Sequence, residues 1–77
     1  MAKFRKKPVV IEAFQYHHGD PIEGDDIRRG EGPYEVFIKT LEGNMQIGDG
    51  DWVITGVKGE RYPCKPDIFE ATYEALE

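Results

Sequence analysis

The sequence predicts a small α+β domain, with a mostly antiparallel sheet of four to five strands and a short C-terminal helix packed on one face. Short runs rich in β-branched and aromatic residues recur along the chain, as is typical of strands. Glycine-containing turns separate several of these runs. The last residues show the apolar spacing of a helix. The 77 residues are enough for one domain with a thin core.

The first expected strand covers residues 9–16 (VVIEAFQY). Both of its faces are largely apolar, so we expect it inside the sheet. It follows a basic arm, residues 1–8, which ends in Pro8; that proline biases the residue before it towards an extended shape.

Residues 17–33 break the strand pattern and are expected to form a long variable loop, with room for one short helical turn. They contain four glycines, two prolines and five acidic residues, and Ile22 and Ile27 are their only aliphatic residues. Such a segment cannot bury a face. Loops this long in small domains are usually functional or mobile.

The rest of the chain, residues 34–77, is expected to form four strands and a helix separated by short turns. Four further strands are expected, over residues 34–40, 44–47, 51–57 and 60–65. Pro63 cannot donate a ladder hydrogen bond, which places the last strand at an edge. Pro66 suits the first turn of a helix, and Asp67 favours the positive end of the helix dipole. We expect this helix to pack on the sheet through the apolar side chains of Ile68, Phe69, Tyr73 and Leu76.

The charge balance narrows the possible partners. The net charge is -5, whereas general nucleic-acid binding needs a basic footprint, so a nucleic-acid partner is not expected. No apolar run reaches the length of a membrane span, no signal peptide is expected, and one cysteine cannot form an internal disulfide. We therefore expect a cytoplasmic protein. The arm carries Lys3, Arg5, Lys6 and Lys7, which are either solvated or in contact with a phosphate or an acidic partner.

Three motifs resemble chemical sites, but none is complete. His17 and His18 lack the spacing of a zinc site, and the segment 48–51 (GDGD) lacks the rest of a calcium loop. Cys64 could act as a nucleophile with its thiol pKa lowered by Lys65, although no base or oxyanion site accompanies it. We expect no catalytic residues, no metal and no cofactor. A small enzyme using Cys64 or His17/His18 stays open as an alternative.

The most informative segment is residues 50–69, which combines a hairpin with the start of the helix. We expect Trp52 and Tyr62 to face each other across the hairpin as an aromatic floor. The candidate site consists of this pair, a charged rim and the basic arm. Its residues are Trp52, Tyr62, Lys58, Glu60, Lys65, Arg5, Lys6 and Lys7, with Arg61 also on the rim. The alternative is a core aromatic pair with solvated charges.

Both ends of the chain resemble a family of small uncharacterised proteins of bacteriophages and prophages. The resemblance rests on the N-terminal segment RKKPVVIEA (5–13), on Gly50-Asp51-Trp52, and on GERYPCKPDIF (59–69). Relatives often have proline where this chain has Asp49, so the turn before the strand can differ. The resemblance implies a phage or prophage context and no catalytic residues.

Together these features lead us to expect a non-catalytic cytoplasmic protein that binds or modulates a host molecule, either a protein or a small molecule. A structural or virion-associated module is the alternative from another class. A homodimer is plausible because a chain of this size buries little apolar surface alone.

Overall fold

The computed structural model describes residues 1–5 and 8–76. The chain forms two three-stranded antiparallel sheets, with strand orders β1-β5-β6 and β2-β3-β4, and a short C-terminal helix. The elements are β1 (Glu12–Gln15), β2 (Ile27–Arg29), β3 (Val36–Thr40), β4 (Gly43–Ile47), β5 (Trp52–Thr55), β6 (Arg61–Cys64) and α1 (Pro66–Thr72).

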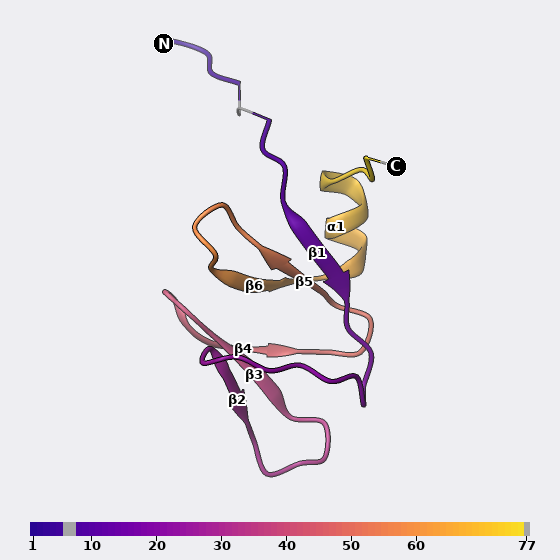
Figure 1. The fold of residues 1–77 in the computed structure, drawn as a ribbon. Helices are drawn as coiled ribbons and strands as arrows, with labels where there is room; N and C mark the ends of the chain where they lie inside the picture. Colours follow the sequence, from indigo (N-terminus) through magenta and orange to yellow (C-terminus); the bar gives the residue numbers. More distant parts are fainter. Residues whose placement is uncertain (6–7, 77) are drawn as a thin grey trace.

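These elements are stacked in three layers, with α1 on one face of sheet β1-β5-β6 and sheet β2-β3-β4 on the other (Figure 1). The predicted α+β class and the C-terminal helix are therefore confirmed. The prediction of a single sheet of four to five strands is wrong, because β2, β3 and β4 form one sheet and β5 and β6 pair with β1 in another.

The turn between β4 and β5 explains this division. The buried Asp51 carboxylate accepts a hydrogen bond from the Gly48 N–H at 2.8 Å, which closes the turn. Gly50 has a φ of +88°, a conformation that glycine adopts without strain. Its N–H donates to the Tyr16 carbonyl, and the Tyr16 N–H donates to the Asp51 carbonyl. The chain therefore leaves β4 and continues alongside β1.

β2 lies inside the segment 17–33, so the prediction of a long loop is wrong for this part of the chain. Ile27 pairs with Ile38 of β3, and Arg29 pairs with Val36. Only one of the three residues of β2 is aliphatic, and its strand conformation comes from pairing with β3. Local composition carries little signal for a strand that its partner defines.

Sheet β1-β5-β6 has β5 at its centre. Val53 of β5 is fully buried and belongs to the core that joins the two sheets, whereas the neighbouring Ile54 is buried on the opposite face. β1 lies at an edge, contrary to the prediction that the first strand lies inside the sheet. β6 lies at the other edge, as Pro63 predicted.

The core lies between the two sheets, and both contribute to it. Its buried members are Tyr16, Ile22, Val36, Ile38, Ile47 and Val53, with Ile27 packed against them. Burial of such a side chain stabilises the fold by roughly 1.5–3 kcal/mol. Because Ile22 precedes β2 in the predicted loop, that segment takes part in the core.

The helix is held by an aromatic contact. The rings of Phe69 and Trp52 stack with centroids 4.1 Å apart and planes 5° apart. No helix residue is buried, and Ile68 and Leu76 are exposed, so the prediction that these two pack on the sheet is wrong. The helix ends at Thr72, before Leu76. No helix in the described part of the chain has the length and apolar character to cross a membrane.

Candidate functional site

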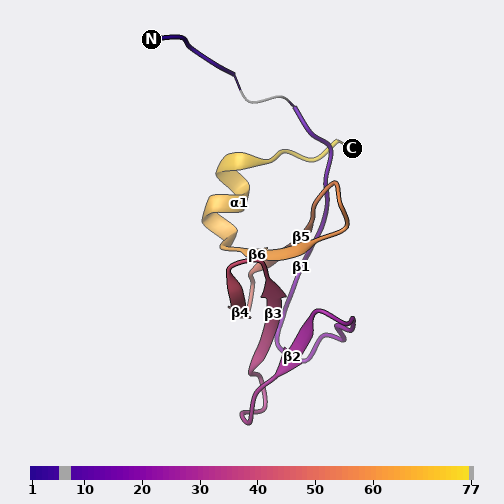
Figure 2. The same ribbon diagram turned by 90° about the vertical axis from the view of Figure 1, so that its left-hand side faces the viewer.

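The candidate site is a hollow above sheet β1-β5-β6, which we call the aromatic hollow. Figure 2 shows α1 and the segment that leads into β1 rising on opposite sides of it. Its volume is about 840 Å³. Four aromatic rings contribute to its lining, those of Trp52, Tyr62, Phe69 and Tyr73. Most of the other lining residues are aliphatic, among them Val9, Val10, Ile11, Val57 and Leu76.

The register of the β5–β6 hairpin places Trp52 and Tyr62 on the same face of the sheet. Trp52 pairs with Cys64, and Tyr62 pairs with Ile54. The two rings are therefore diagonal neighbours, and the expectation that they face each other directly is wrong by one pair. The Trp52 indole nitrogen is buried and has no hydrogen-bond partner among the described residues. The hydrogen-bonding capacity of this buried donor is therefore unused in the described structure.

Tyr62 and Tyr73 link the hairpin to the end of the helix. Burial raises the pKa of the Tyr62 phenol, and the neighbouring Tyr73 hydroxyl raises it further. Tyr73 packs in turn against Phe69, with ring centroids 5.0 Å apart. The Tyr62 phenol is therefore neutral at physiological pH, and it adds an uncharged ring to the floor of the hollow.

The predicted charged rim is largely engaged in the turns of the fold. Glu60 lines the hollow, but its carboxylate accepts the Lys58 backbone N–H at 2.9 Å and so closes the hairpin turn. The Lys65 ammonium lies 3.4 Å from the Asp51 carboxylate. The structure brings Trp52, Tyr62 and Glu60 to the hollow, whereas Lys58 and Lys65 do not line it.

Of the basic arm, Pro8 lines the hollow. Arg5 is exposed and does not line the hollow, and Lys6 and Lys7 lie outside the described residues. Neither of the described basic residues of the arm, Lys3 and Arg5, therefore lines the hollow as expected.

Arg61, which the sequence placed on the rim, connects the two sheets. Its guanidinium donates to both carboxylate oxygens of Asp26, at 2.8 and 2.5 Å, and to the Glu23 carbonyl at 2.8 Å. The hydrogen bond from Arg61 holds the pKa of Asp26 below its ordinary value. The contact anchors the start of β2 to β6. Composition alone gives no signal for it, since the two residues are far apart in sequence.

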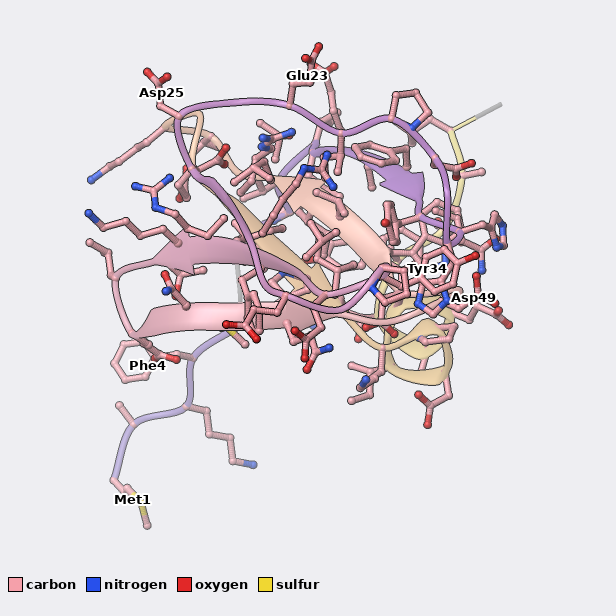
Figure 3. The ribbon with its side chains drawn as sticks, turned by 90° about the horizontal axis from the view of Figure 1, so that it is seen from below. Met1, Phe4, Glu23, Asp25, Tyr34 and Asp49 are labelled. Carbon is pink, nitrogen blue, oxygen red and sulfur yellow. The ribbon has the colours of Figure 1, made fainter. Side chains whose placement is uncertain are left out.

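The two histidines lie at another corner of the molecule. The His18 backbone N–H donates to Asp49 at 2.8 Å, and the His18 ring stacks on Tyr34 with centroids 4.6 Å apart. Figure 3 shows Tyr34 and Asp49 at the same end of the molecule. The His17 ring nitrogen lies 3.8 Å from Asp49. Among residues 1–5 and 8–76, no group of three histidine, cysteine or acidic side chains is placed to hold a metal ion.

Cys64 is half-buried beside the helix start. Burial raises the pKa of its thiol, and the carboxylates of Asp51 and Asp67 add to that effect. The expectation that Lys65 lowers this pKa is wrong, because Lys65 is directed to Asp51. A raised pKa reduces the thiolate fraction that nucleophilic chemistry requires.

Comparison with known proteins gives no relative from which a role could be transferred. No protein family model, no curated protein and no solved structure matches the chain. The resemblance to phage and prophage proteins accordingly stays a prediction from the sequence.

Proposed function

We propose that this protein is a non-catalytic binding protein that receives an apolar segment of a partner protein in the aromatic hollow. The observation that carries the proposal is the combination of ring floor and open aliphatic walls. Val10 and Leu76 on those walls are 74% and 77% exposed. Apolar side chains grouped around a concave surface are characteristic of interaction sites.

The charge of the hollow favours a neutral or basic apolar segment. Glu60 and Glu74 line it, and no lysine or arginine does so among the described lining residues. A phosphate-bearing small molecule would meet carboxylates there without a compensating cation. Of the two partners that the sequence left open, a protein or a small molecule, we therefore propose the protein.

The biological setting rests on the sequence resemblance alone. We place the protein in the cytoplasm of a bacterial host, encoded by a phage or prophage, with a host protein as the partner it modulates. A virion-associated role is the alternative, and the presence of the protein in purified particles would favour it.

The binding surface is tested with the neutral apolar dye Nile red as a probe. We expect the dye to bind the native protein, and Val10→Glu and Leu76→Glu to weaken binding about tenfold, or ~1.4 kcal/mol, because each places a charge on an apolar wall. Both positions are exposed, so the substitutions leave the fold intact.

Ile68→Glu is the matched control. Ile68 is an exposed apolar residue of α1, at 56%, and does not line the hollow. Dye binding should be unchanged in this variant. Equal losses in all three variants, or no dye binding by the native protein, would contradict the proposed site.

A further inference from the structure

A second groove lies where the two sheets meet, on the side of the β5–β6 hairpin turn. We call it the acidic groove; its volume is about 920 Å³. Leu41 and Met45 give it an apolar surface, and Leu41 is fully exposed. Glu23, Asp25 and Glu42 surround that surface.

The carboxylates of the groove outnumber its cations by five to two. Its charged lining residues are Glu23, Asp25, Asp26, Glu42 and Glu60 against Lys39 and Arg61, and the Arg61 guanidinium is occupied by Asp26. Glu23, Asp25 and Glu42 form no ion pair with any described residue. In Figure 3 the side chains of Glu23 and Asp25 point outwards into solvent. The groove therefore presents an apolar surface inside a border of net negative charge.

The N-terminal arm has the complementary composition. Four of the ten basic residues of the chain fall within residues 3–7, whereas all fifteen acidic residues come after the arm. Met1 and Phe4 add apolar side chains, and Phe4 is 94% exposed. Fully extended, eight residues span at most roughly 26–29 Å.

Residues 1–5 lie beyond α1 and away from both sheets, so their side chains are accessible to a second molecule (Figures 1 and 2). We propose that the acidic groove binds the N-terminal arm of a second copy of this chain, with Phe4 against Met45 and Leu41 and the arm cations beside the groove carboxylates. Methionine packs readily against aromatic rings, and opposite charges steer and orient such an encounter. Reciprocal exchange of arms closes a two-fold dimer.

The proposal is tested by sedimentation of the full chain over a concentration series at low and high salt. We expect reversible dimerisation that weakens about tenfold or more at high salt, because exposed charge pairs are screened. Phe4→Ser should weaken it by a similar factor. Ile68→Ser, at an exposed apolar position outside the groove, should not.

Charge reversal identifies the two surfaces. An arm variant (Lys3→Glu with Arg5→Glu) and a groove variant (Glu23→Lys with Glu42→Lys) should each associate more weakly than the native chain, and a mixture of the two should recover association. Glu31→Lys with Glu70→Lys changes the net charge by the same amount as the groove variant at exposed sites outside the groove, and should leave association nearly unchanged.

Three results would overturn the proposal. A monomer at every concentration would show that the arm is unbound or folds back on its own chain. Association that survives both reversals would place the interface elsewhere. A mixture that associates no better than either variant would show that arm and groove do not meet.

Discussion

Arg61 shows how one side chain can determine the relation between two sheets. It lies on the edge strand β6, and its guanidinium donates two parallel hydrogen bonds to the carboxylate of Asp26, just before β2. Both side chains are less than one-third exposed, so this pair is screened less than a surface ion pair. A lysine could not reproduce the forked geometry. The pair therefore attaches the segment 17–33, whose composition predicts a loop, to strand β6.

Removing the charge of Asp26 should destabilise the protein. We expect Asp26→Asn to lower the free energy of unfolding by about 1–3 kcal/mol in urea denaturation, because the Arg61 guanidinium loses its carboxylate partner. Glu70→Gln, at an exposed helix position without such a partner, serves as the control and should change little. Equal stability of Asp26→Asn and the native protein would contradict this role.

The same pair predicts a pH dependence. Because the folded protein lowers the pKa of Asp26, its contribution is fully present above the unfolded value of about 3.9 and is lost as the pH falls through the folded value. The stability difference between native protein and Asp26→Asn should thus shrink in the acid range. A difference that stays constant down to acid denaturation would argue against the assignment.

At the scale of elements, the sequence predicts those strands and helices whose formation depends on a local residue pattern. Four of the six strands fall within predicted segments, and β4 begins one residue before its predicted segment. α1 begins at Pro66, as its proline and acidic first turn indicate. β2 was missed because Arg28 and Arg29 carry no strand pattern and their strand depends on β3. Too many helix residues were predicted to pack on the sheet, because α1 has only seven residues and contacts the sheet chiefly through Phe69.

The attachment of this short helix should depend on one ring. A seven-residue helix is marginal in water without tertiary contacts. We expect Phe69→Ala to cost about 1–3 kcal/mol, below the range of a fully buried ring, and to shift the emission of Trp52, the only tryptophan, to longer wavelength. Ile68→Ala should change neither quantity appreciably. An unchanged Trp52 spectrum in Phe69→Ala would mean that the stack does not hold the helix.

At the scale of the whole molecule, two features could not be predicted from the sequence. They are the division into two sheets and the position of the hollow. The division depends on the turn at Asp51, whose carboxylate closes it, and on contacts between residues distant in sequence. The aromatic members of the site were predicted through Trp52 and Tyr62. Of the predicted charged members, Glu60 lines the hollow, whereas Lys58 and Lys65 do not, and Lys65 has its partner in Asp51. The site is consequently an apolar surface with acidic residues beside it, where the sequence suggested a rim of both charges.

The most direct test follows the Trp52 indole N–H resonance by NMR during titration with two synthetic peptides. One is a leucine- and phenylalanine-rich peptide with a single lysine, and the other carries glutamate in place of that lysine. The resonance should shift with both peptides and saturate at lower concentration with the lysine peptide, because apolar walls and acidic residues line the hollow. No shift with either peptide, or tighter binding of the glutamate peptide, would contradict the aromatic hollow as the site of partner recognition.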